Sequence, residues 1–203
     1  LTGFTCSAGL LLVTAYDLLF VSDGRYARQA ADQLATAGVE ARIEISGTGQ
    51  REVLRAAAEG IARLGLEAAA VTWAQQRRYA DEWFPGAELV ATEGLVEALR
   101  IVKDEGEVAR IEAAAHIADT ALAEVRALLL DGPTESEFGL ALDTAIRRLG
   151  AEGTSFETIV ASGPNGAKPH HRPGGRHIAE GDLVVVDFGA LVDGYCSDMT
   201  RTF

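Results

Sequence analysis

The dipeptide Asp193-Gly194 and the two segments around it constrain the fold of this chain most strongly. Leu183 to Val186 is an aliphatic, largely β-branched run typical of a buried strand, and Tyr195 to Phe203 alternates well enough to form a returning strand. Asp-Gly favours the tight turn that joins two antiparallel strands. The segment therefore predicts a β-hairpin.

Two aspartates lie on either side of this turn, Asp187 at the end of the first strand and Asp198 on the second. They either oppose each other directly or, if the turn is centred on Asp193-Gly194, lie one diagonal apart on the same sheet face. Neighbouring carboxylates repel unless a proton or a cation lies between them. Carboxylates suit divalent ions such as Mn, Mg, Co or Zn, so the pair predicts half of a two-metal site. The alternative is that one aspartate ends a strand while the other is solvated.

A longer match surrounds the two aspartates. Phe156 to Pro173 reads FETIVASGPNGAKPHHRP, and Gly181 to Phe203 reads GDLVVVDFGALVDGYCSDMTRTF. These stretches contain a glycine-containing loop that ends in Pro-His, a Gly-Asp before a strand, an Asp at the strand end and a Ser-Asp-Met-Thr-Arg-Thr-Phe block. In this order and spacing they resemble the catalytic domain of the pita-bread metallopeptidases, specifically the aminopeptidase P and prolidase branch.

The resemblance implies roles for individual residues. The family's strand-end aspartate and the aspartate before Thr-Arg-Thr are metal ligands, and they correspond to Asp187 and Asp198. The family's active-site histidine, outside the metal shell, corresponds by loop length to His170, with His171 as the next candidate. His177 is interpreted as structural. The implied cofactors are two divalent metal ions, with manganese preferred and cobalt or zinc as alternatives.

The implied reaction is metal-dependent hydrolysis of the bond between an N-terminal residue and proline, by an Xaa-Pro aminopeptidase or an Xaa-Pro dipeptidase. Proline requires a dedicated pocket because its amide has no N–H and its φ is restricted. In this interpretation His170 holds the substrate or the developing oxyanion. Two alternatives stay open. One is a creatinase-like C–N hydrolase that uses no metal, which the retained Asp187 and Asp198 disfavour, and the other is a non-catalytic adaptor of the same fold.

The first hundred residues show a different pattern. From Leu10 to about Leu99, apolar runs alternate with helical stretches, which predicts an α/β layer domain. We expect strands at 10–13, 18–21, 41–45, 68–72 and 88–91, and helices at 25–37, 51–64 and 74–84. The opening LTGFTCSAGLLLVT, followed by SDGRYARQA, resembles the creatinase-type N-terminal domain of the same branch. We therefore expect residues 1–100 to form an α/β creatinase-like N-terminal domain whose start is missing.

Residues 101–203 are expected to form the first part of an α+β pita-bread catalytic domain. Glu105 to Leu130 carries apolar residues at helical spacing and is followed by Asp131-Gly132-Pro133, which stops a helix. Thr134-Glu135-Ser136-Glu137 predicts a capping turn that opens a second helix, ending at Leu149. Neither helix offers a catalytic pattern.

The chain is also expected to be a fragment. In the resembling family, one His and two Glu ligands follow the Thr-Arg-Thr strand, whereas this chain ends at Phe203, and its sole methionine is Met199. We expect truncation at both ends, an incomplete metal site and no peptidase activity of these residues alone. A naturally shortened or pseudoenzymatic product is the alternative.

Composition favours a cytoplasmic protein. A formal net charge of -12 and a pI near 4.7, with two lysines among eighteen basic residues, disfavour binding to nucleic acid or to anionic membranes. The apolar runs are too short to span a bilayer. Cys6 and Cys196 form no spacing motif, which favours a reducing compartment. The expected partners are a proline-containing peptide and a second copy of the chain in a homodimer.

Overall fold

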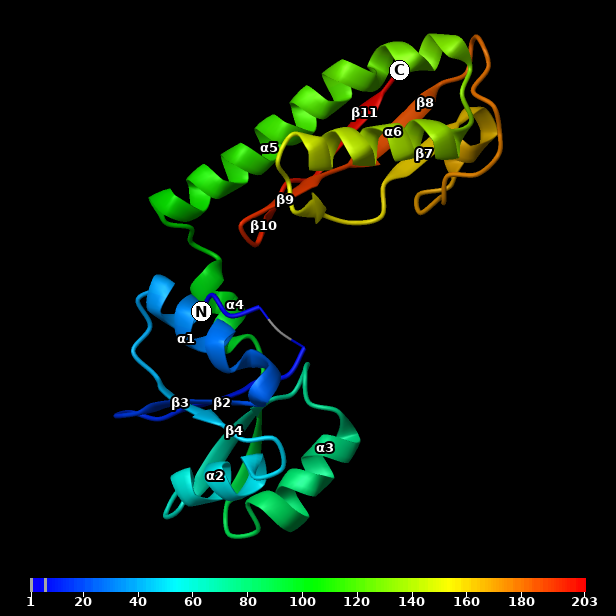
Figure 1. Ribbon diagram of the computed structural model, residues 1–203. Coiled ribbons are helices and arrows are strands. Elements are labelled where there is room, and N and C mark those ends of the chain that lie inside the picture. The colour runs from blue at the N-terminus through cyan, green and yellow to red at the C-terminus, as the bar shows by residue number, and fades with distance from the viewer. Residues whose placement is uncertain (1, 6) are drawn as a thin grey trace. The chain divides into compact units, whose positions relative to one another are not determined.

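The computed structural model describes residues 2–5 and 7–203. Cys6 lies outside the described residues. The chain forms two compact units, Leu1–Ile101 and Val102–Phe203, whose elements are labelled in Figure 1. None of the described helices is long and apolar enough to cross a membrane.

The described residues of the first unit form two small sheets. One has the order β1-β2-β3, in which β1 and β2 are antiparallel whereas β2 and β3 are parallel. The other is the parallel pair of β4 and β5. The strands are Leu10–Val13 (β1), Leu18–Ser22 (β2), Arg42–Ile45 (β3), Arg63–Glu67 (β4) and Glu88–Thr92 (β5). The helices are Gly24–Tyr26 (η1), Ala27–Thr36 (α1), Gln50–Ala57 (α2), Trp73–Arg78 (α3), Tyr79–Trp83 (η2) and Leu95–Arg100 (α4).

Strand β2 is the centre of this unit because both of its faces are covered. Leu19 and Val21 cluster with Leu54 of α2, whereas Phe20 clusters with Leu34 of α1. Successive side chains of a strand point to opposite faces, so the two clusters lie on opposite sides of the sheet. The α/β layer arrangement predicted for this region is therefore confirmed.

One strand of the first unit was predicted in the wrong place. We expected a helix over 51–64 and a strand over 68–72, but α2 ends at Ala57 and the strand is β4, Arg63–Glu67. Gly60 has a φ of +80°, the left-handed conformation that commonly follows a helix end, so the stop signal was Gly60 and not Gly65. Leu64 and Leu66 then alternate with exposed residues, which is the pattern of a half-buried strand.

In the second unit, α5 (Glu105–Val125) and α6 (Glu135–Arg148) pack against each other and against the strands (Figure 1). Each begins with a capping box, in which the backbone N–H of Glu107 donates to Asp104 and that of Glu137 donates to Thr134. The capping turn predicted at Thr134 is therefore confirmed. The helix predicted over 105–130 is α-helical only to Val125 and then tightens into the 3-10 helix η3 (Arg126–Asp131).

The strands of this unit form two three-stranded antiparallel sheets, β11-β8-β7 and β10-β9-β6. Their bounds are Gly153–Thr154 (β6), Ile159–Ser162 (β7), Val184–Phe188 (β8), Ala190–Val192 (β9), Tyr195–Cys196 (β10) and Met199–Thr202 (β11), and the 3-10 turn η4 is Gly163–Ala167. The predicted hairpin therefore exists, but each arm is divided between the two sheets.

The core of the second unit decides which face of the hairpin is available to a ligand. Val184, Val186 and Phe188 of β8 are buried in one cluster with Phe138 of α6. Full burial of such side chains contributes roughly 1.5 to 3 kcal/mol each. Asp187 alternates with them and is half-buried, so it lies on the face turned away from this core.

Candidate functional site

The hairpin register places the two aspartates one diagonal apart. Asp187 of β8 pairs with Thr200 of β11, and Asp198 lies two residues before Thr200. Of the two registers that the sequence allowed, the chain adopts the one centred on Asp193-Gly194. Residues two apart on a strand share a face, so this register favours a shared face for both carboxylates. The Thr200 hydroxyl donates to Asp187 Oδ1 at 2.9 Å and orients that carboxylate.

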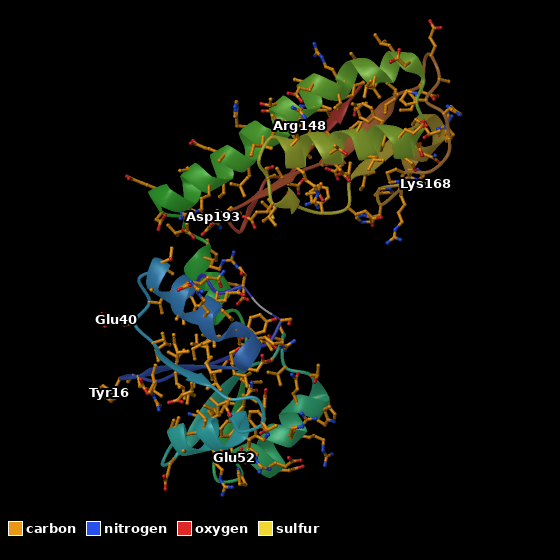
Figure 2. All side chains as sticks on the ribbon, viewed as in Figure 1. Tyr16, Glu40, Glu52, Arg148, Lys168 and Asp193 are labelled. Carbon is orange, nitrogen blue, oxygen red and sulfur yellow. The ribbon has the colours of Figure 1, made fainter. Side chains whose placement is uncertain are left out.

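A two-residue turn and an ion pair hold the tip of the hairpin. Asp193 and Gly194 both have positive φ, at 49° and 78°, as a type I′ turn requires. Arg110 of α5 donates through Nε to Asp193 Oδ2 at 2.5 Å, and this hydrogen bond is the main reason why the pKa of Arg110 is raised. Figure 2 shows Asp193 at one end of the second unit and Lys168 at the other.

The hairpin crosses from one sheet to the other at Gly189. A Cβ on this residue would lie 2.0 Å from the carbonyl oxygen of Ser197 and 2.5 Å from Ser155 Oγ. The approach is held by hydrogen bonds, because Ser155 Oγ donates to the Ser197 carbonyl at 2.6 Å and the Ala190 N–H donates to Ser197 Oγ at 3.0 Å. The position of Asp198, directly after Ser197, therefore depends on a close contact that only glycine permits.

The donor set of the hairpin fits part of a metal site. Asp187 is half-buried and Asp198 is exposed, and hard divalent cations prefer carboxylate oxygens such as theirs. Within residues 2–5 and 7–203, no group of three or more His, Cys, Asp or Glu side chains is arranged to hold a metal ion. Among the described residues of the hairpin, Asp187 and Asp198 therefore have side chains that could bind such a cation.

The two neighbouring histidines differ in environment. They lie in the histidine loop, defined here as Ser162 to Gly174, which leaves the sheet at the end of β7. Ser162 pairs with Val184, three residues or about 10 Å along β8 from Asp187. His170 is exposed, whereas the side chain of His171 is 13% exposed and its Nε2 lies 2.7 Å from Glu135 Oε2. His170 is thus presented to solvent beside an anchored neighbour.

Glu135, the first residue of α6, was not singled out from the sequence. Its side chain is 0% exposed and lies against the histidine loop. Burial opposes its ionisation, yet hydrogen bonds, with that from Asn165 the largest, lower the pKa of its carboxyl from 4.5 to about 2. A signal was present, because Glu137 completes the capping box and leaves Glu135 without a role in it.

His177 lies apart from this arrangement. Its Nδ1 is 3.0 Å from the carbonyl oxygen of Gly132, before the start of α6. This contact connects His177 to the turn before α6, which fits the structural role expected from the sequence.

Comparison with known proteins gives matches along nearly the whole chain. Residues 1–102 match the family described as the Creatinase/Prolidase N-terminal domain, and residues 109–203 match metallopeptidase family M24. The uncharacterized peptidase YqhT of Bacillus subtilis (strain 168) is 38% identical over 207 residues, which cover 100% of this chain and 56% of that protein.

Solved structures agree with these matches. The Xaa-Pro dipeptidase from Bacillus anthracis is 36% identical with a TM-score of 0.88, and the match covers 100% of this chain and 56% of the other. The X-Pro aminopeptidase from Thermotoga maritima MSB8 is 32% identical with a TM-score of 0.82, over 99% of this chain and 55% of the other. The chain thus spans about half the length of the relatives it matches.

Proposed function

Because the chain belongs to the aminopeptidase P and prolidase branch of the pita-bread metallopeptidases, we propose that the whole protein hydrolyses the bond between an N-terminal residue and proline. The family and the fold class expected from the sequence are both confirmed: a creatinase-type N-terminal domain precedes part of an M24 pita-bread domain. We assign residues 1–100 to the first domain and 101–203 to the second, and the division into compact units after Ile101 supports this boundary.

The observation that carries the proposal is the register of the hairpin. It sets Asp187 one diagonal apart from Asp198. Asp187 lies on β8, whose other face is buried against α6, and Asp198 directly precedes β11. Thr200 donates to Asp187, and the ion pairs found in the described part of the chain include neither Asp187 nor Asp198. Two such acids on one open face repel, and a divalent cation between them relieves that repulsion.

In the proposed site each described residue has a distinct task. Asp187 and Asp198 would hold the metal ions as carboxylate ligands, while the Thr200 hydroxyl orients the Asp187 carboxylate. Two divalent ions, preferably manganese, would lower the pKa of a water molecule and polarise the scissile carbonyl. His170 holds the substrate or donates to the developing oxyanion. We propose that the remaining ligands come from the part of the whole protein that corresponds to the rest of its relatives' length.

Substitution of the aspartates tests this function. In the whole protein, Asp187→Asn and Asp198→Asn each remove a ligand charge and keep the side-chain volume, so we expect loss of bound manganese together with loss of Xaa-Pro hydrolysis. Asp131→Asn, at the exposed last residue of η3, is the matched control and should leave both unchanged. Metal content is measured by elemental analysis and hydrolysis with Xaa-Pro peptides. Normal activity in either site variant, with metal still bound, would refute the proposal.

Removal of metal separates this reaction from a creatinase-like one. We expect EDTA to abolish hydrolysis of Xaa-Pro peptides and added Mn²⁺ to restore it, because the carboxylate pair has no catalytic role without an ion. Hydrolysis of a C–N bond in a small guanidino compound that survives EDTA would favour the metal-independent reaction instead.

We further propose that the whole protein acts in the cytoplasm and forms a homodimer. The acidic composition and the absence of a cysteine spacing motif support the compartment. Cell fractionation tests the location, and light scattering of the purified protein tests the oligomeric state.

A further inference from the structure

We propose that Glu135 is a positioning residue, whose carboxylate fastens both ends of the histidine loop to α6 and thereby fixes how His170 faces the substrate. The catalytic part of this inference rests on the proposed function. The structural part, that Glu135 holds the loop, stands on the contacts alone.

The two carboxylate oxygens of Glu135 divide the loop between them. Oε1 accepts from the backbone N–H and the hydroxyl of Ser162, both at 2.8 Å, and from Asn165 Nδ2 at 2.9 Å. Oε2 accepts from His171 Nε2 at 2.7 Å and from the N–H of Gly174 at 3.2 Å. One buried side chain thus contacts the first residue of the loop, the last residue and two between them.

The start of α6 adds backbone bonds to the same connection. The N–H of Glu135 donates to the Arg176 carbonyl at 3.0 Å, and the N–H of Ser136 donates to the Gly174 carbonyl at 3.1 Å. Ser136 Oγ also donates to the carbonyl of Pro173 at 2.9 Å. The first N–H groups of a helix have no partner within it, and here Gly174 at the end of the loop and Arg176 just beyond it accept from two of them. The loop is therefore attached to a helix that is itself fixed in the core.

The charge of Glu135 is what makes the contact set possible. An ionised carboxylate only accepts hydrogen bonds, so it can satisfy five donors at once, whereas a neutral amide must also donate. Because the carboxylate only accepts, the proton between Glu135 and His171 lies on His171 Nε2. The ring of His171 is thus fixed in one orientation, and its backbone neighbour His170 follows.

The position of the anchored residue within the loop suggests more than a structural role for Glu135. Lys168 and His170 are exposed on the loop. His171, the residue directly after His170, is the one whose side chain binds the buried Glu135. Displacement of a reacting group by about 1 Å can lower a rate by roughly 100-fold. Release of the anchor is therefore expected to lower kcat through His170.

The first test observes the anchor without substrate. In the whole protein labelled with ¹⁵N, the imidazole spectrum should show a proton on His171 Nε2, assigned with the His171→Gln variant. Glu135→Gln should move that proton or broaden its signal, because the amide forces His171 or Gly174 to lose its acceptor. Amide exchange at Ser162 and Gly174 should become faster. An unchanged His171 signal in Glu135→Gln would overturn the proposal.

The second test asks whether Glu135 acts through His170. We expect Glu135→Gln to lower kcat for an Xaa-Pro peptide by roughly 10- to 100-fold with bound metal retained. In a His170→Ala background the same substitution should have almost no further effect on kcat, because the group being positioned is gone. Glu137→Gln is the matched control, since Glu137 lies in the same helical turn but caps only Thr134. It should lower stability and leave kcat unchanged.

The outcomes distinguish this inference from the proposed function. An equal loss of kcat in the presence and absence of His170, or unchanged kcat in folded Glu135→Gln, would contradict positioning. If Glu135→Gln does not fold, Asn165→Ala removes one of the five donors and should show the same dependence on His170 with a smaller loss. A wild-type protein that hydrolyses no Xaa-Pro peptide would refute the proposed function together with the catalytic role of Glu135. The imidazole spectrum would then decide the anchoring role independently.

Discussion

Replacement of Gly189 by alanine tests how the hairpin brings the aspartates together. The added Cβ would lie 2.0 Å from the Ser197 carbonyl oxygen and 2.8 Å from its carbonyl carbon. Ordinary van der Waals contact begins at 3.4 Å, so the closer contact falls short by about 1.4 Å. Both atoms belong to the backbone, and no rotation of a side chain can relieve the clash. The two arms of the hairpin must therefore move apart next to Asp198.

The energetic cost follows from this separation. Overpacking of a filled core typically costs 1 to 3 kcal/mol, and this contact lies at the severe end of that range. The separation can also break the hydrogen bonds of Ser197 with Ser155 and with the Ala190 N–H, and each such bond contributes about 1 kcal/mol to stability. We expect the free energy of unfolding to fall by about 3 to 5 kcal/mol, the upper value applying if both hydrogen bonds are lost. Because the displaced segment leads into Asp198, manganese affinity should fall as well.

Urea denaturation and calorimetric titration with Mn²⁺ measure these two effects. Gly175→Ala is the control, because Gly175 has no positive φ and its Cβ would meet nothing within 4 Å. Its stability should change by no more than about 0.5 kcal/mol. If Gly189→Ala were as stable as the control and bound Mn²⁺ like the wild type, the reasoning from the close contact would be wrong.

Three further predictions concern charge. Because the pKa of Glu135 falls from 4.5 to about 2 on folding, it should contribute roughly 3 kcal/mol above pH 4.5, and this contribution should disappear as the pH falls towards 2. Acid denaturation of Glu135→Gln should lack that pH dependence, and an identical profile would contradict the assignment. Burial raises the pKa of Asp143, although the hydrogen bond from Thr158 lowers it, so the ionised carboxylate is less favourable in the folded than in the unfolded chain. Asp143→Asn removes that charge and should raise the melting temperature at pH 7. A lower melting temperature would show that the charge stabilises the fold. Residues 1–203 alone should bind Mn²⁺ weakly, because Asp187 and Asp198 are only two ligands, and tight stoichiometric binding by calorimetry would exclude this.

The parts of the fold that local chemistry determines could be predicted from the sequence. The hairpin depends on a turn dipeptide between two apolar runs, and the helix starts depend on capping residues such as Thr134. The expectation that the two aspartates share a face does not depend on the choice of register, because both allowed registers have the same parity. The choice between those registers required the structure.

Features that depend on distant contacts could not be predicted. His170 and His171 are adjacent and chemically identical, and only the contact with Glu135 makes one of them anchored and the other exposed. The displacement of β4 arose from two competing glycine stops, Gly60 and Gly65, between which local pattern did not decide. In both cases the missing information was which segment packs against which.

Anomalous X-ray scattering from crystals of the whole protein grown with Mn²⁺ would locate the metal relative to the two aspartates. We expect manganese peaks in contact with carboxylate oxygens of both Asp187 and Asp198, on the face of β8 turned away from α6. Manganese bound at another place, with these two carboxylates pointing to different sides of the hairpin, would contradict this expectation.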